Sequence, residues 1–400
     1  MKISFFLSFL LFFSTISKNA IAQEQVTPIH QVIYLIFNED YHQAEQILDS
    51  LMQATPDNPE SFFYYSLIPW RQSAFVEDIK NFDKLTQRRL EKCIEVAEKL
   101  LEIEPENAVA YFYRGGAHGY LGSMYARQKR WLKTGYHAWK GTSDLEKAAE
   151  LDPEMHDTYY GLGLYHVMAA HQSGIVRFIQ KLLPIPNGDA RKGLEYLQLA
   201  IQKGNYAPVP ARSALAFAYL HFETDYQKTL DTLAPILKIH PTSTDLLIMQ
   251  INALFNREFV QPANSWKEIL FYLDNFEKLA VHRKMQLSDW WHSKLQFIRG
   301  YAYYSLGQYE QAEKIIAQYN AQQKSDDENY LLGVGYLTQG KMTELQGMRN
   351  SAIEYYHKAQ KCREMGNLKE IAEHLQENPF NGENEQTRIL GIFTELPERP

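Results

Sequence analysis

Apolar and small residues between Leu295 and Ile316 recur at helical spacing, with one interruption. The segment LQFIRGYAYYSLGQYEQAEKII breaks at 306–308, which predicts two short helices joined by a tight turn. Gly300 has no side chain, so a neighbouring helix can approach its backbone. Ala312 is small where the second helix crosses the first, and Ile316, one turn beyond, fills the gap. Such a hairpin cannot bury its apolar face alone, which predicts further hairpins along the chain.

Prolines mark the ends of several similar segments. Each of Pro56, Pro105, Pro153 and Pro241 follows an apolar helical pattern, and the endings EIEP, ELDP and KIHP are near-copies of one another. Proline is common just past a helix end because it cannot continue the helix. This self-similarity predicts a chain built from helical repeats.

The spacing resembles that of the tetratricopeptide repeat (TPR) superfamily, bacterial exported type. Gly300, Tyr303, Ala312 and Ile316 fall at the offsets of the signature L-G-x2-Y…A-x3-F, and Leu162-Gly163 supplies the full Leu-Gly pair. The resemblance implies an all-α fold, a right-handed α-solenoid of TPR-like helical hairpins. Counted by the prolines and the register, we expect about seven hairpins along the chain.

The chain divides into three predicted parts. Residues 1–22 read as a signal peptide, residues 23–365 as the TPR-like solenoid, and residues 366–400 as a C-terminal cap with a loose tail. An alternative for the tail is that it lies along the solenoid groove. Residues 161–201 also resemble a segment of the eukaryotic TPR family linked to inclusion-body clearance, which implies an adaptor role.

Three stretches depart from the repeat pattern. The long connection at 122–141 predicts extended helices with a protruding hairpin. Residues 171–188 contain Leu-Pro-Ile-Pro, which breaks a helix. Residues 254–290 fit no clean repeat, whereas 327–364 read as one more helical pair.

The N-terminus predicts export. Lys2 precedes an apolar run over 3–16, and Ala20-Ile21-Ala22 supplies a small-x-small cleavage pattern. We expect cleavage after Ala22 and a periplasmic or secreted protein. The alternative, a membrane anchor, is disfavoured because the run is short for a membrane span.

Charge and cysteine content narrow the function classes. Without Lys2 and Lys18 the chain has 39 basic and 48 acidic side chains, a net charge of −9, which argues against nucleic-acid binding. Cys93 and Cys362 lie far apart in the chain, so we expect no disulfide and stabilisation by packing, with two buried thiols.

No catalytic constellation is present in the sequence. It contains no H-E-x-x-H, G-x-S-x-G or P-loop motif, and Gly161-Leu162-Gly163 follows no predicted strand. His166 and His171 lack the spacing of metal ligands on a helix. We therefore expect no cofactor, no metal and no enzyme activity.

The TPR resemblance implies that the first helix of each repeat lines a concave groove. Carried over by register, the candidate partner-binding residues are Phe63, Trp70, Arg71, Phe112, Tyr120, Tyr160, Phe222, Phe297, Tyr301 and Tyr304. These rings either form a trough for a protein or peptide partner, or pack as core against adjacent helices. The Lys/Asn clamp of chaperone-type TPRs is not evident, since only Lys294 matches it.

A second candidate surface is basic and aromatic. It runs from 127 to 140 without an acid, and its candidate contact residues are Arg127, Lys129, Arg130, Trp131, Lys133 and Trp139. The pattern suits an anionic membrane surface or an acidic partner. The alternative is a solvated hairpin whose rings pack on its own helices.

The sequence thus predicts an exported, non-catalytic TPR scaffold or adaptor that binds a protein or peptide through a concave aromatic groove. The alternative is a lipid- or membrane-surface-docking carrier that uses the basic hairpin at 127–140. An enzyme ranks third.

Overall fold

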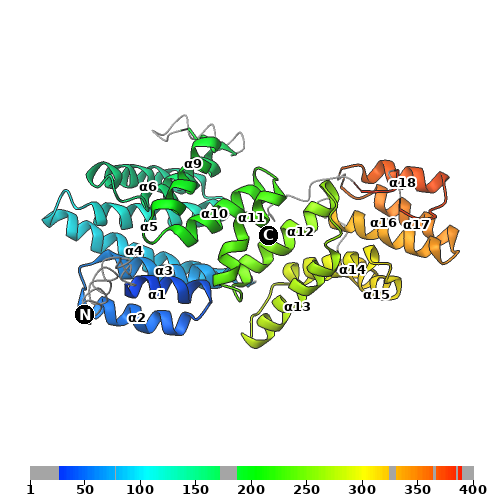
Figure 1. The fold of residues 1–400 in the computed structure, drawn as a ribbon, viewed down its shortest axis with the longest axis horizontal. Coiled ribbons are helices and arrows are strands. Elements are labelled where there is room, and N and C mark those ends of the chain that lie inside the picture. Colours follow the sequence, from blue (N-terminus) through cyan, green and yellow to red (C-terminus); the bar gives the residue numbers. More distant parts are fainter. Residues whose placement is uncertain are drawn as a thin grey trace, which may run out of the picture.

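The computed structural model describes residues 27–76, 78–171, 187–323, 330–363, 366–383 and 386–389. Every regular element in these residues is an α-helix, and the helices number seventeen (Figure 1). The first nine are α1 Pro28–Phe37, α2 Tyr41–Ala54, α3 Pro59–Gln72, α4 Ile79–Ile103, α5 Ala108–Arg127, α6 Trp131–Leu151, α7 Thr158–Ala170, α9 Ala190–Lys203 and α10 Pro208–His221. The others are α11 Tyr226–Ile239, α12 Thr244–Val260, α13 Trp266–His282, α14 Asp289–Ser305, α15 Tyr309–Gln322, α16 Tyr330–Leu345, α17 Arg349–Gln360 and α18 Leu368–Glu377.

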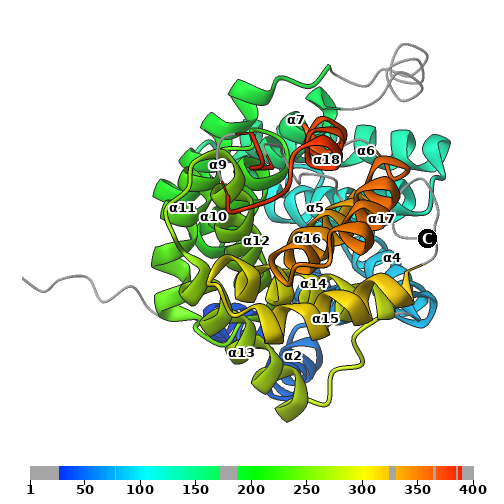
Figure 2. The ribbon, with the colours of Figure 1, turned by 90° about the vertical axis from the view of Figure 1, so that its right-hand side faces the viewer.

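Consecutive helices pack as antiparallel hairpins, which stack into a TPR-like solenoid (Figures 1 and 2). The described hairpins are α1–α2, α3–α4, α5–α6, α7–α9, α10–α11, α12–α13, α14–α15 and α16–α17, with α18 packed on α17. This is one hairpin more than the sequence predicted. The extra one, α12–α13, covers 244–282 and overlaps the stretch 254–290 that fits no clean repeat. Helix α12 is buried almost all round and so lacks the amphipathic repeat pattern.

Glycines set the distance between the helices of three hairpins. A Cβ on Gly115 would lie 3.0 Å from the carbonyl oxygen of Gly141, and a Cβ on Gly193 would lie 2.7 Å from that of Gly163. At Gly300 it would lie 2.9 Å from Ile316 Cδ1, which confirms the close approach predicted there. The turn between α14 and α15 also falls where it was predicted.

The solenoid winds tightly enough for its first hairpin to contact its sixth. Arg283, at the end of α13, donates Nη1 to Glu39 Oε2 at 2.6 Å and to the carbonyl oxygen of Thr242 at 2.7 Å. Its Nη2 donates to the carbonyl oxygen of Asn38 at 2.7 Å. Glu39 also accepts from the backbone N–H of Thr244 at 2.7 Å, which fixes the start of α12. These contacts close one turn of the array.

Contacts of α3 and of the residues that follow it with α12 and α14 also help to close this turn. Arg71 on α3 forms an ion pair with Asp245 on α12 at 2.9 Å. Trp291 Nε1 on α14 donates to the carbonyl oxygen of Ala74 at 3.3 Å. The apolar face of α1 lies in one buried cluster with residues of α3, α5, α10, α11 and α12. The interior of this turn is therefore enclosed by first helices of the repeats.

Other predictions for individual segments have mixed outcomes. The α5–α6 hairpin is extended, as predicted, but its turn is only 128–130. Residues 366–389 pack where described, with Phe380 and Ile389 buried, rather than hanging loose. The predicted signal peptide at 1–22, most of 171–188 and the tail from 390 lie outside the described residues. Neither cysteine forms a disulfide; Cys93 is buried, whereas Cys362 is half-buried.

The glycine contacts give a stability test with an internal control. Gly193→Ala should destabilise the protein by about 1–3 kcal/mol, because its Cβ meets backbone atoms of α7. Gly119→Ala on α5 should instead stabilise by about 0.5–1 kcal/mol, since its Cβ meets nothing within 4 Å. Urea unfolding measures both, and equal shifts would contradict this account.

The closing ion pair gives a second test. Arg283→Met should cost about 3–5 kcal/mol, because Glu39 would stay buried without its counter-ion. Arg191→Met is the control, since Arg191 pairs with Glu195 on an exposed face, and it should change stability by less than about 1 kcal/mol. Similar effects of the two variants in thermal unfolding would show that the closure contributes little.

Candidate functional site

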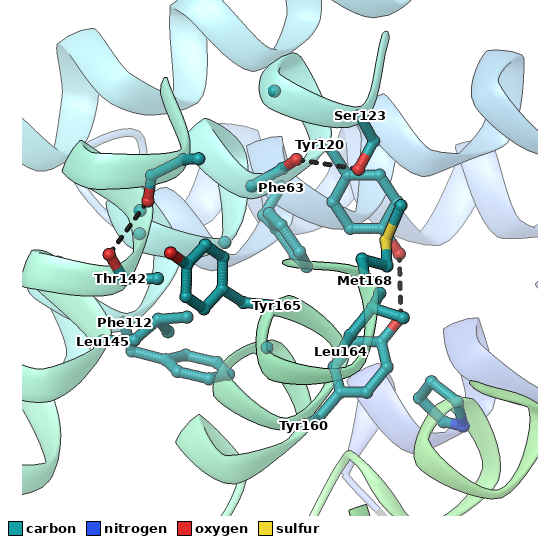
Figure 3. A pocket seen from close by; sticks show the side chains of 18 of the residues that line it. Phe63, Phe112, Tyr120, Ser123, Thr142, Leu145, Tyr160, Leu164, Tyr165 and Met168 are labelled. Carbon is teal, nitrogen blue, oxygen red and sulfur yellow. Dashed lines mark hydrogen bonds between the residues drawn. The ribbon is translucent and has the colours of Figure 1, made fainter. Parts of the chain in front are cut away.

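An apolar cavity of about 210 Å³ lies inside the closed turn (Figure 3). Its walls come from α3, α5, α6, α7 and α10, so first helices of four repeats contribute to it. Aromatic and aliphatic side chains dominate the lining: Phe63, Phe112, Tyr120, Trp131, Leu145, Tyr160, Leu164, Tyr165 and Met168. Concave, largely apolar pockets with few polar groups are typical of binding sites.

Glycines create the space. The segment RGGAHGYLG of α5 places Gly115, Gly116, Gly119 and Gly122 on the cavity lining, with Gly135, Gly141 and Gly161 from α6 and α7. Some of these let helices touch, as at Gly161, where a Cβ would lie 2.6 Å from Leu145 Cδ1. At Gly119, by contrast, a Cβ would stand in open space. The cavity is thus a hollow that small residues leave unfilled.

Two tyrosines supply the polar feature of the wall. The hydroxyl groups of Tyr120 and Tyr160 lie 3.3 Å apart (Figure 3). Burial raises the pKa of both phenols, so both are neutral at physiological pH. Tyr120 is held by edge contacts with Phe63, at a ring separation of 5.8 Å, and with Trp70, at 5.6 Å. The pair offers hydroxyl groups to a polar atom of a ligand.

Asp157 is the one charged side chain among the described lining residues. Its carboxylate accepts the backbone N–H groups of Asn205 at 3.1 Å, Tyr206 at 2.8 Å and Ala207 at 2.6 Å. These groups form the start of α10, where a carboxylate is stabilising. The oxygens of Asp157 are therefore occupied in holding α10 against α7, a structural task.

The predicted groove residues separate into two groups. Phe63, Phe112, Tyr120 and Tyr160 line the cavity together. Trp70 packs behind Tyr120, with the guanidinium of Arg127 4.7 Å from its ring centre.

The other predicted residues lie elsewhere. Arg71 is engaged in the ion pair with Asp245, and Phe222 stacks on His171 at the end of α10 with ring centres 4.7 Å apart. Phe297, Tyr301 and Tyr304 are buried in the core of the C-terminal half. For Phe297 and Tyr301 the core interpretation holds in place of an open trough. Tyr304 is buried as well, but its hydroxyl donates to Glu383, and none of the three rings lines the cavity.

The basic hairpin divides as well. Arg127 forms an ion pair with Asp83 beneath the surface, so it is a structural cation rather than a contact for a membrane. Arg130 and Lys133 are exposed and lie over the ring of Tyr125, at 5.1 and 4.9 Å. Lys129 takes the left-handed conformation in the turn, with φ of 56°.

The two tryptophans of this hairpin differ in place. Trp131 lines the cavity, and Trp139 carries Lys140 over its ring at 5.1 Å. The exposed tip therefore consists of Lys129, Arg130, Leu132 and Lys133, and Leu132 is 73% exposed.

Sequence reasoning predicted Tyr160 on the second wall of the cavity but missed Leu164 and Tyr165 of the same helix. Leu164, Tyr165 and Met168 on α7 face the rings of α3 and α5 (Figure 3). The signal that could have found the site is the run of glycines at 115–122. Four glycines in two helical turns are costly for a helix unless something must come close to it.

No group of three or more His, Cys, Asp or Glu side chains among the described residues could hold a metal ion. No helix in the described part is long and apolar enough to cross a bilayer.

Comparisons with known proteins found structural likenesses and no sequence family. No family model matches the sequence, and no curated protein matches it either. Among solved structures, the chain is similar to a thermophilic TPR protein of Thermus thermophilus, at 19% identity and a TM-score of 0.36, covering 58% of this chain and 98% of that one. It is similar to the human IFIT1 dimer with PPP-AAAA at 14% identity and a TM-score of 0.38, covering 87% and 76%. A tetratricopeptide repeat protein from Parabacteroides merdae matches at 15% identity and a TM-score of 0.26, covering 88% and 96%.

At these identities and TM-scores the likenesses carry no argument about function. The arrangement of consecutive hairpins makes this chain a TPR-like all-helical repeat protein, and no sequence family is assigned to it.

Proposed function

We propose that the protein is an exported, non-catalytic scaffold that holds a protein partner by an apolar side chain or short segment inserted into the ring-lined cavity. The cavity is the observation that carries this proposal. It gathers four of the predicted groove residues with the wall of α7 around a space that no described side chain fills. TPR-like scaffolds commonly bind proteins, and a buried apolar anchor is the usual energetic centre of such an interface.

The nature of the lining supports an anchor rather than a reaction. Tyr120 and Tyr160 are neutral, and Asp157 is occupied by backbone N–H groups. Rigid aromatic walls lose little conformational entropy when a partner binds. Export rests on the sequence of the first 22 residues and would place the partner in the periplasm or outside the cell.

Site-specific photo-crosslinking tests the proposal. A benzoylphenylalanine at position Ser123, on the cavity lining, should crosslink to a defined partner in cells that make the protein. Gly119→Phe should fill the cavity and reduce that product by more than about tenfold, since a buried apolar anchor contributes roughly 1.5–3 kcal/mol. Gly119→Ala is the matched control and should leave the product unchanged.

The same crosslinker at position Glu98, on the exposed face of α4, is the control for site. Equal products at the two positions, or a product that survives Gly119→Phe in a folded protein, would refute the cavity as the partner site.

A second candidate function is docking to an anionic membrane surface by the tip of the α5–α6 hairpin. The observation in its favour is the exposed Leu132 between Arg130 and Lys133. An apolar side chain flanked by cations can enter the headgroup region while the cations meet lipid phosphates.

Vesicle sedimentation tests this alternative. Arg130→Glu/Lys133→Glu should reduce binding to phosphatidylglycerol vesicles by roughly tenfold or more, because each basic residue contributes about 1 kcal/mol. The control is Lys203→Glu/Lys238→Glu, the same charge change on exposed faces of α9 and α11. An equal loss of vesicle binding in both double variants would show that only net charge matters. No vesicle binding by the wild type would refute the membrane-docking proposal.

A further inference from the structure

Helix α16 is buried on nearly every side, although it carries many polar residues. Thr338, Gln339, Lys341, Thr343 and Glu344 are all buried in it. Helices α15, α17 and α18 cover part of its surface. Helix α14 contacts α16 as well, and the chain's own end, residues 378–383 and 386–389, bonds to Lys341 and Glu344; we name it the C-terminal segment. Within those residues the segment forms no helix.

A buried ammonium group holds the middle of the C-terminal segment. Lys341, only 2% exposed, donates Nζ to Glu383 Oε1 at 2.7 Å and to the carbonyl oxygen of Thr387 at 2.5 Å. Tyr304 on α14 donates its hydroxyl to the same carboxylate oxygen at 2.5 Å. Burial lowers the pKa of Lys341, and the charge of Glu383 opposes that shift. One carboxylate thus satisfies groups from two repeats.

Phe380, three positions before Glu383, attaches the C-terminal segment to α16 at a second point. The ring of Phe380 is buried, with Lys341 Nζ 5.3 Å from its centre. Its backbone N–H donates to Glu344 Oε2 at 2.9 Å. Glu344 is itself fixed by Arg349 at 2.5 Å and by the hydroxyl of Tyr356 at 2.7 Å. The receptor atoms are therefore held in place by the helices and not by the segment.

The far end of the segment reaches the preceding repeats. Ile389 is buried in the core cluster, and Arg388 Nη2 donates to the carbonyl oxygen of Glu258 on α12 at 3.1 Å. Asn367 Nδ2 donates to the carbonyl oxygen of Arg388 at 3.1 Å. The C-terminal segment is non-helical and is attached by backbone groups, one ring and one carboxylate, as a bound extended peptide would be.

We propose that the face of α14 and α16 is a binding site for an extended peptide with an aromatic residue followed three positions later by a carboxylate, and that the C-terminal segment is its exchangeable occupant. The site is separate from the cavity of the N-terminal turn and does not rest on the function proposed for it. It also explains why Tyr304, at a groove position of its repeat, is buried: the groove is filled by the chain itself.

The chemistry of Lys341 determines which partner can replace the segment. An ammonium group in this position loses most of its hydration, so an empty groove is costly. A peptide that brings its own carboxylate restores the ion pair, whereas an apolar peptide leaves Lys341 unpaired. Glu383 remains 42% exposed, so the pair can be reached from solvent at one side.

A labelled synthetic peptide of residues 378–400 tests the exchange on the full-length protein. The tethered segment acts at an effective concentration of about millimolar, so the wild type should bind micromolar peptide weakly. Glu383→Lys should expel the tethered segment through repulsion from Lys341 and improve the dissociation constant for the peptide by at least about tenfold. Adding Lys341→Met to that variant should remove the gain.

Glu377→Lys is the matched control, because it makes the same charge change on an exposed position of α18, and it should bind as the wild type does. A peptide carrying Glu383→Gln should bind the Glu383→Lys protein at least about tenfold more weakly than the unaltered peptide. Equal peptide binding by the wild type and the Glu383→Lys protein, or no binding by either, would overturn the proposal.

Hydrogen exchange on the wild-type protein provides a second test, which does not depend on the folding of the Glu383→Lys variant. An exchangeable segment should open by itself, so the amides of 380–389 should exchange roughly a hundredfold faster than those of α16. Exchange of both at one common rate, through global unfolding, would make the C-terminal segment a fixed structural part and overturn the proposal.

Discussion

The bridge between Arg283 and the first hairpin is the contact on which the architecture of the N-terminal half depends. One guanidinium joins Glu39, Asn38 and Thr242, and thereby brings α1 against α12 and α13. An open solenoid would present a groove along its whole length. In this turn α3, α5, α6, α7 and α10 line a cavity, and the lining includes the exposed Gly119. The ion pair is buried, so its geometry is enforced by the cost of leaving either charge alone.

Glycines have two roles in this half of the molecule: they let helices approach closely, and they leave space on the cavity lining. Reciprocal contacts such as Gly163 with Gly193 let backbones touch, and these contacts set the distance between the two helices of a hairpin. A Cβ on Gly119 would meet nothing within 4 Å, so the lack of a side chain there enlarges the cavity. The inner faces of the two halves of the molecule differ in what occupies them. The N-terminal turn leaves a hollow lined by rings, while the C-terminal repeats fill theirs with the C-terminal segment.

Sequence reasoning reached the fold because each hairpin is a local unit. Gly300, Ala312 and Ile316 predicted a close crossing that the structure confirms, and the repeated prolines gave the register. It could not place rings that depend on distant chain. Phe63 and Phe297 occupy equivalent register positions, yet Phe63 lines a cavity and Phe297 lies in the core of the C-terminal half. That difference has two origins. The closure of the N-terminal turn depends on contacts between distant parts of the chain, and the C-terminal segment has no periodicity from which its position could be predicted. The partner of Arg127 was likewise invisible, since Asp83 belongs to the preceding hairpin.

The central claim is that the closed turn contains an apolar, unfilled cavity at the glycine face of α5. A crystal structure under xenon pressure measures this most directly, since xenon enters dry apolar cavities. The account predicts a xenon atom beside Gly119, between Phe63, Tyr120 and Met168, in the wild type and none there in Gly119→Phe. A wild-type crystal with xenon bound elsewhere but with side chains filling the space beside Gly119 would contradict it.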